Sequence, residues 1–208
     1  IRQDTQAPTK PTLSISKEAT DTTVTLQASA TDEASGVQEY TLLETSGKIP
    51  PQTSEDGVFD LTYLNSDTEY VFTVTAKDKA GHISEISDVF NVKTRKKPFA
   101  NAVVTLKNAD KIYNGMVQTP DVEVSMNGTA LTADQYVVSY EQDGTAVAAP
   151  TKAGTYKVVV TAGENGDYEG IASGQPTYTI AKKTITASLN GTLTKTYDGT
   201  TKVLEAQK

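Results

Sequence analysis

The side chains that could carry chemistry in this 208-residue sequence are few in kind. Cysteine is absent and His82 is the only histidine, which excludes thiol nucleophiles, cysteine-ligated zinc and clusters of several histidines. The remaining general acids and bases are carboxylates, and no pair of them is distinguished by its spacing from ordinary exposed strand charges. The sequence therefore predicts no enzyme, no catalytic residue and no cofactor, and we expect His82, in the loop DKAGHIS, to be a turn residue.

Three aspartates could supply oxygen ligands to a calcium ion. Asp4 lies in the N-terminal segment, Asp32 in TDEASG and Asp78 in KDKAG, each in or near an expected loop. Hard oxygen ligands that converge from several loops suit Ca²⁺, but the sequence has neither EF-hand nor RTX spacing. Aspartates that cap turns or face solvent are favoured, so the sequence assigns no metal ligands and leaves a calcium ion near these three residues open.

The run YTLLET at 40–45 fits the Tyr-x-Leu-x-Glu pattern of some Gram-positive pilin modules, in which a buried acid promotes a bond between Lys and Asn. In this chain the run falls on an expected strand, where alternation puts Tyr40 and Leu42 inward and Glu44 beyond them. Chance strand patterning is therefore the favoured interpretation of the run, and we predict no isopeptide bond.

The net charge of −7 and the placement of the basic residues argue against a nucleic-acid partner. Binding to phosphate backbones needs a basic face, and the one basic cluster is the run 95–97, which we expect to be a solvated linker before Pro98. The mean hydropathy is −0.40 and no apolar stretch approaches the ~18 residues of a membrane span, so no membrane contact is predicted. The chain starts at Ile1 without signal-peptide features, and we expect it to be a piece of a longer precursor.

Short runs of alternating apolar and polar residues predict the elements that must position these side chains. The runs 22–30, 69–78 and 154–163 are rich in Val, Thr and Tyr and place their large apolar residues on one face. Asp-Gly or Asn-Gly pairs recur between such runs, as at 56–57 and 127–128, and these pairs suit tight hairpin turns. Strands at this cadence without intervening helices predict an all-β chain of antiparallel sandwiches.

The segment LNSDTEYVFTVTAKDKAGHIS carries the most specific family features. Leu64, Thr68 and Tyr70 stand where fibronectin type III domains have a tyrosine corner, in which a buried Tyr returns its hydroxyl to upstream backbone. Residues 1–97 resemble a fibronectin type III domain of the bacterial kind. One position departs from the family, because Ala28 stands where the second strand usually has Trp, and the core must therefore be filled differently or be smaller.

Several motifs follow one another in the next segment, among them Tyr113-Asn114-Gly115, KAGTYKVVV, NGDYEG and the closing PTYTIAKK. In this order they make residues 98–183 resemble the bacterial Ig-like surface repeats known as MBG or YDG modules. The motif TKTYDGTTKVL then returns near the C-terminus, so residues 184–208 resemble the truncated start of a further repeat.

These resemblances imply an elongated array of tandem Ig-like and fibronectin type III β-sandwiches. The function they imply is that of a non-catalytic extracellular spacer or adhesion module of a bacterial cell-surface protein, with an unidentified host or cell-wall protein or glycan as partner. The alternative is an accessory region of a secreted carbohydrate-active enzyme. The domain content of the rest of the coding sequence separates the two.

The arm 184–208 is too short to fold alone, because ordering its residues costs more free energy than its few apolar side chains return. We expect it to borrow an apolar surface or a sheet edge from residues 98–183, or from a neighbouring chain by strand addition. The second version predicts a dimer through this C-terminal arm.

Overall fold

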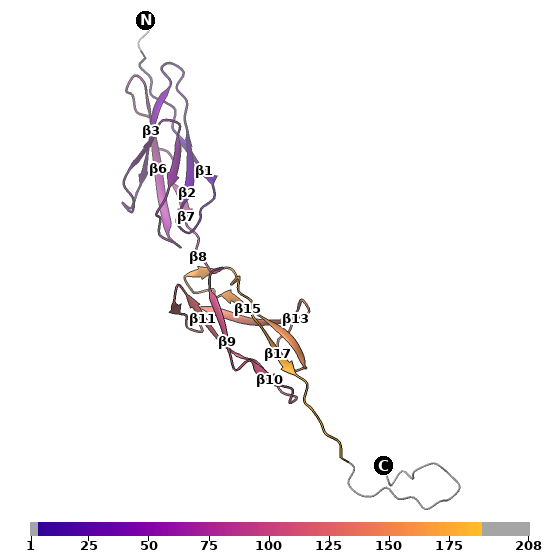
Figure 1. The fold of residues 1–208 in the computed structure, drawn as a ribbon. Coiled ribbons are helices and arrows are strands. Elements are labelled where there is room, and N and C mark those ends of the chain that lie inside the picture. Colours follow the sequence, from indigo (N-terminus) through magenta and orange to yellow (C-terminus); the bar gives the residue numbers. More distant parts are fainter. Residues whose placement is uncertain (1–3, 189–208) are drawn as a thin grey trace, which may run out of the picture.

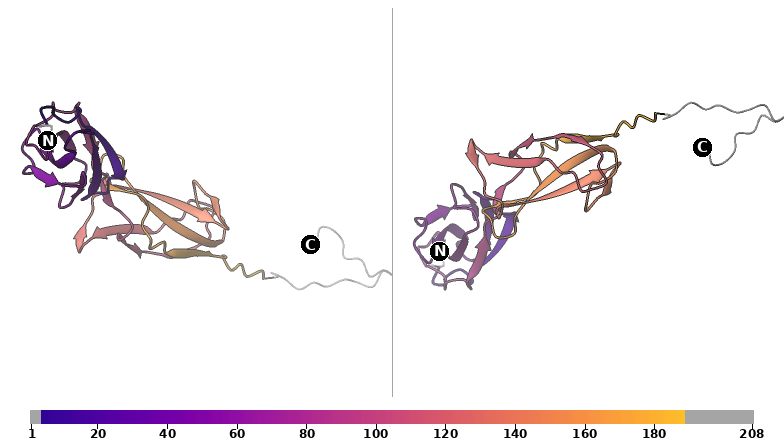
Figure 2. Two further views of the ribbon diagram at one scale, coloured as in Figure 1. Left: turned by 90° about the horizontal axis from the view of Figure 1, so that it is seen from above. Right: turned by 90° about the horizontal axis from the view of Figure 1, so that it is seen from below.

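The computed structural model describes residues 4–188, which form two β-sandwiches joined end to end (Figure 1). The N-terminal and C-terminal ends of this region lie at opposite ends of the molecule, and Figure 2 shows the two sandwiches from above and below. The prediction of an all-β fold with tandem, elongated sandwiches is confirmed. Between residues 4 and 188 no helix is long and apolar enough to cross a membrane.

The first sandwich packs a three-stranded sheet, in the order β1-β2-β5, against a four-stranded sheet, in the order β4-β3-β6-β7. Every strand pair in it is antiparallel. Its strands are β1 (Thr12–Lys17), β2 (Val24–Ser29), β3 (Val37–Glu44), β4 (Gln52–Ser54), β5 (Val58–Leu61), β6 (Glu69–Asp78) and β7 (Phe90–Lys93).

Alternation along the strands builds the core of this sandwich, as the sequence predicts. In β6 every second residue is buried, so that Tyr70, Phe72 and Val74 all face the other sheet. Ala28 is buried at the position where Trp was expected, and the aromatic members of the core are Tyr40, Phe59, Tyr70 and Phe72.

Tyr70 forms the predicted tyrosine corner at the start of β6. Its side chain is 1% exposed, and its hydroxyl oxygen accepts a hydrogen bond of 2.8 Å from the backbone N–H of Asn65. The Tyr70 ring stacks on the Phe72 ring with 6.3 Å between ring centroids. The Nζ of Lys48 lies 5.4 Å from the centroid of the Tyr70 ring. The corner therefore ties the loop before β6 to the core.

Glu44 also faces inward, on the same side of β3 as Tyr40 and Leu42, and is 2% exposed. Its carboxylate accepts hydrogen bonds from the Ser46 hydroxyl at 2.7 Å and from the backbone N–H groups of Lys48 and Val71 at 2.7 and 3.3 Å. Burial alone would raise the pKa of Glu44, but these hydrogen bonds outweigh it and hold the pKa below its usual value. The carboxylate is thus satisfied by local backbone and hydroxyl donors.

The second sandwich packs a three-stranded sheet, β12-β11-β9, against a five-stranded sheet, β10-β17-β15-β13-β14. The pair β10–β17 is parallel, whereas the other pairs in these two sheets are antiparallel. Its strands are β9 (Val103–Lys107), β10 (Asp110–Ile112), β11 (Asp121–Met126), β12 (Thr129–Ala130), β13 (Tyr136–Gln142), β14 (Thr145–Ala146), β15 (Gly154–Ala162) and β17 (Thr177–Ala181).

Tyr156 gives the second sandwich a corner of its own. It lies near the start of β15, is 1% exposed, and donates a hydrogen bond of 2.9 Å from its hydroxyl to the carbonyl of Lys152. Its ring stacks on Tyr178 with 5.6 Å between centroids, and burial raises the pKa of Tyr178 strongly. The sequence singled out the segment KAGTYKVVV for its resemblance but not for this contact.

The Tyr113-Asn114-Gly115 motif follows β10, the second strand of this sandwich. Gly115 adopts a φ of +81°, and Asn114 closes the turn by accepting a hydrogen bond of 2.9 Å from the N–H of Met116. The backbone N–H of Tyr113 donates to the carbonyl of Ala181, so the motif lies beside the strand that ends the domain.

The predicted C-terminal arm is described only in its first residues. Residues 182–188 belong to no strand and are exposed, and the side chain of Ile185 is 88% exposed, so it does not pack against residues 98–183. Residues 189–208, which carry the rest of the predicted arm, lie outside the described residues. A dimer through this arm stays a prediction.

Candidate functional site

Among residues 4–188, two groups of charged side chains are candidates for a functional site. One lies at the joint between the sandwiches, where β8 (Lys97–Pro98) pairs in parallel with β16 (Tyr168–Glu169). The other lies at the far end of the first sandwich and includes two of the three aspartates that the sequence singled out.

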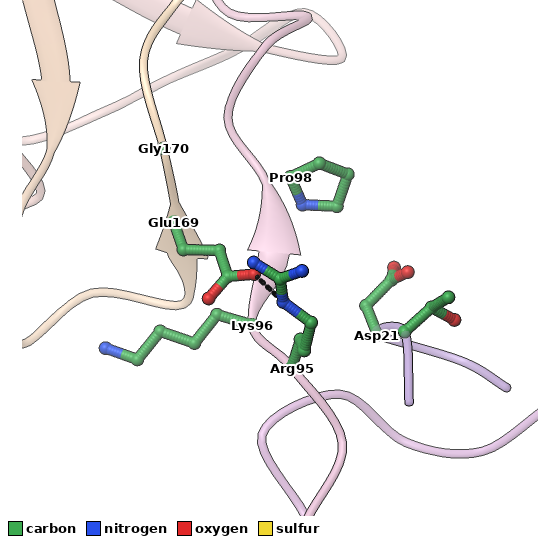
Figure 3. Close-up of a pocket in the computed structure, with 7 residues that line it drawn as sticks. Asp21, Arg95, Lys96, Pro98, Glu169 and Gly170 are labelled. Atoms are coloured by element: carbon green, nitrogen blue, oxygen red, sulfur yellow. Dashed lines mark ion pairs between the residues drawn. The ribbon is translucent and has the colours of Figure 1, made fainter. Parts of the chain in front are cut away.

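Arg95, at the joint, contacts both sandwiches. Its N–H donates to the carbonyl of Thr20 at 3.0 Å and its carbonyl accepts from the N–H of Asp67 at 2.9 Å, so its backbone belongs to the first sandwich. Its side chain reaches the second sandwich, where Nε lies 2.7 Å from Oε1 of Glu169 (Figure 3). Arg95 therefore connects the two domains directly.

The residues after Arg95 join the second sandwich through backbone hydrogen bonds. Lys97 N–H donates to the carbonyl of Asp167 at 3.0 Å, and Phe99 N–H donates to that of Glu169 at 2.8 Å. The Nζ of Lys96 lies 2.5 Å from the carbonyl oxygen of Glu164. The run 95–97 links the two sandwiches with Arg95 and Lys97 exposed, as expected of a solvated linker, but its residues also make backbone and side-chain contacts with the second sandwich.

A pocket of about 420 Å³ lies at this joint (Figure 3). Its lining residues are Thr20, Asp21, Arg95, Lys96, Pro98, Glu169 and Gly170. The carboxylate of Glu169 is paired with Arg95, so it is not poised as a free general base. The pocket thus lies between residues of both sandwiches, beside the ion pair that connects them.

The second place is built by the loop between β6 and β7. Asp78 ends β6 with its side chain fully buried, and its Oδ1 accepts a hydrogen bond of 2.8 Å from the N–H of His82. Asp78 N–H donates to the carbonyl of His82 at 3.0 Å, and Gly81 provides the positive φ, +98°, that closes the loop. The loop thereby turns the ring of His82 toward Asp78, with Nδ1 2.9 Å from Oδ2.

Asp4 joins this pair from the segment before β1. One ligand atom from each of Asp4, Asp78 and His82 lies within 4.8 Å of the others. The Oδ1 of Asp4 accepts a hydrogen bond of 3.0 Å from the N–H of Gln6, while its Oδ2 is buried without a hydrogen-bond partner among the described residues. Ser35 lies close enough to lower the pKa of Asp4, yet its hydroxyl hydrogen bond of 3.2 Å runs to Asp32.

Asp32 lies outside this group of three ligand atoms. Its Oδ1 accepts hydrogen bonds from the N–H groups of Ser35 and Gly36, both at 2.8 Å, and these hydrogen bonds lower its pKa. Asp32 is thus the turn-capping aspartate that the sequence favoured. His82 lies in the loop that follows β6 and is a member of the cluster, and the spacing of Asp78 and His82 across Gly81 is the sequence signal that corresponds to it.

Topology and corner geometry together define the class of this protein: a tandem of fibronectin type III-like β-sandwich domains. No family model matches the chain. Chitinase A1 of Niallia circulans is 38% identical over 91 residues, which cover 44% of this chain and 13% of that enzyme. Exoglucanase A of Cellulomonas fimi is 32% identical over 173 residues, which cover 73% of this chain and 19% of that enzyme. The chain thus spans less than a fifth of the length of these relatives.

Solved structures with similar architecture share little sequence with the chain. Chitinase ChiA74 from Bacillus thuringiensis superposes with a TM-score of 0.39 at 19% identity, covering 88% of this chain and 28% of the chitinase. A segment of two fibronectin type III domains from chicken tenascin superposes with a TM-score of 0.42 at 16% identity, covering 85% of this chain and 99% of the segment. The finer resemblance of residues 98–183 to MBG or YDG repeats stays a prediction.

Proposed function

We propose that this chain is a non-catalytic accessory region of a secreted bacterial enzyme that acts on polysaccharides. The observation that carries the proposal is the alignment with Exoglucanase A, which covers 73% of this chain and therefore extends beyond either sandwich alone. The alignment with Chitinase A1 adds a second enzyme of the same broad class. Each alignment occupies a small share of its enzyme, as expected for a module beside a catalytic domain. An extracellular location follows from this proposal.

The role of the region is to hold other domains at a set distance and angle. The longest strand of the first sandwich, β6, has ten residues, which at ~3.3 Å per residue gives a length of about 33 Å for one domain. Two such domains in line separate their outer ends by roughly twice that length. The contacts of Arg95 with both sandwiches support a joint that keeps this separation constant and does not bend freely.

The domain content of the coding sequence around this chain tests the proposal. We expect a catalytic domain for a polysaccharide on the same polypeptide. A cell-wall sorting signal with further repeats and no catalytic domain would instead support the spacer or adhesion module of a bacterial cell surface. In that case the partner would be a host or cell-wall protein or glycan.

A binding measurement with the chain itself tests the non-catalytic spacer role. The purified chain is mixed with insoluble chitin and, separately, with cellulose, and the fraction left in solution is measured after sedimentation. We expect the chain to stay in solution with both polymers and to release no soluble sugar from them. Sedimentation with one polymer but not the other would replace the spacer role with that of a binding module.

A further inference from the structure

The cluster of Asp4, Asp78 and His82 combines one fully buried carboxylate, that of Asp78, with the half-buried side chains of Asp4 and His82. Asp78 is fully buried, and its two oxygens receive the N–H and the ring of a single residue, His82. The buried Oδ2 of Asp4 receives no hydrogen bond from the described residues. A buried carboxylate oxygen without a donor is costly, because it has lost its water and gained no partner.

The two carboxylates also repel each other. One oxygen of Asp4 and one of Asp78 lie within 4.8 Å of each other, so two carboxylates approach the same point. Two carboxylates and one imidazole thus converge on one point, and the Oδ2 of Asp4 has no hydrogen-bond donor there among the described residues.

We propose that Asp4, Asp78 and His82 form a binding site for a divalent transition-metal ion of the Zn²⁺ type. Two carboxylates and an imidazole match the ligands that Zn²⁺ takes in proteins, whereas Ca²⁺ takes six to eight oxygen ligands. Ligand atoms of tetrahedral zinc lie roughly 3.4 Å apart, for metal–ligand bonds near 2.05 Å. The ligand atoms here lie within 4.8 Å of one another, so small side-chain rotations bring them to bonding distance.

The bound ion joins segments that are far apart in sequence. Asp4 precedes β1, whereas Asp78 and His82 belong to the end of β6 and the loop that follows it. The segment before β1 is also held by hydrogen bonds between Thr9 and Thr31 and by the exposed ion pair of Lys10 with Asp88. The metal fixes the direction in which the chain enters the first sandwich. Through that direction it affects the spacer role proposed above. This consequence, and no other part of the inference, rests on the proposed function.

The test uses Zn²⁺ and the whole chain, prepared without a histidine tag. Thermal unfolding of the first sandwich is followed with Zn²⁺, with Ca²⁺ and with EDTA, and the stoichiometry is measured by titration calorimetry. We expect one Zn²⁺ per chain and a rise in melting temperature of about 10 °C when free Zn²⁺ reaches about 100 times its dissociation constant. Ca²⁺ at the same concentration is expected to produce no rise. Co²⁺ offers a second readout, because tetrahedral coordination gives it visible absorption bands.

Two variants and a matched control locate the ion. Asp4→Asn and His82→Asn are expected to weaken Zn²⁺ binding at least tenfold and to remove the thermal shift. Asp88→Asn removes an exposed carboxylate that pairs with Lys10 of the same N-terminal segment and is expected to leave binding unchanged. Absence of Zn²⁺ binding to the parent chain, or binding that survives in both variants, would overturn the proposal. A shift with Ca²⁺ alone would overturn the assignment of the ion. None of these outcomes depends on whether a catalytic domain accompanies the chain.

Discussion

Replacement of Tyr70 separates the contribution of its hydroxyl from that of its ring. Tyr70→Phe keeps the ring, which is 1% exposed and stacked on Phe72, but removes the acceptor for the Asn65 N–H. Asn65 is itself exposed, so water can reach part of the freed donor, and we expect a loss of about 1–2 kcal/mol of unfolding free energy. Tyr70→Ala also leaves a cavity in the core, and we expect a total loss of about 3–5 kcal/mol.

The assay is urea unfolding followed by NMR, with resolved amide signals from each sandwich. For a domain of this size, 1 kcal/mol corresponds to a shift of about 4–8 °C in melting temperature, so a parallel thermal series gives a second measure. Tyr63→Phe is the matched control, since Tyr63 is 96% exposed and its replacement should leave the midpoint unchanged. Signals from the second sandwich should also keep their midpoint in both Tyr70 variants. The reasoning fails if Tyr70→Ala unfolds at the parent's urea concentration.

Three further predictions concern single positions of the first sandwich. The pKa of Glu44 is lowered on folding, so its contribution to stability is present above its unfolded pKa of ~4.3 and is lost as pH falls through the lower folded value. The urea midpoint, measured at a series of acid pH values, should therefore fall below about pH 4. The Glu44→Gln variant should show a smaller dependence of the midpoint on pH. Tyr63 has a φ of 58°, a conformation that glycine adopts without strain. Tyr63→Gly should therefore raise the unfolding free energy by about 1 kcal/mol. An unchanged or lower urea midpoint would contradict this prediction. A Cβ at Gly57 would lie 2.5 Å from the Ala28 carbonyl oxygen, whereas a Cβ at Gly47, which has a similar φ of +74°, would meet no atom within 4 Å. Gly57→Ala should therefore destabilise the fold by more than Gly47→Ala. Equal urea midpoints for the two variants would count against this steric reasoning.

Strand alternation made the first sandwich predictable from sequence. The period-two pattern of β6 specified which face of the strand is buried, and the Leu64–Thr68–Tyr70 spacing located the corner hydrogen bond. Both signals are local, because they depend on residues within one strand and the loop that precedes it. The partner of β10 could not be read in this way, since a parallel pairing with β17 joins segments far apart in sequence.

The candidate sites were harder to predict for the same reason. Asp4 and Asp78 were both singled out as possible ligands, but their convergence with His82 depends on how the N-terminal segment crosses the end of the sandwich. Charge beside proline usually indicates a solvated linker, and for the run 95–97 the sequence predicts no more than that. Its backbone pairing with residues 167–169 follows from the docking of two domains, which no local pattern encodes.

The distribution of distances between the two sandwiches tests the central claim, a spacer with a fixed joint, most directly. The chain has no cysteine, so Glu55→Cys and Ala148→Cys, both at exposed positions, provide the only two sites for spin labels. Pulsed electron paramagnetic resonance should give one narrow distance distribution, and adding Arg95→Ala with Lys96→Ala should broaden it by removing the side-chain contacts across the joint. A broad distribution in the chain with Arg95 and Lys96 intact would contradict the account, because the two sandwiches would then move independently and could not set a fixed separation.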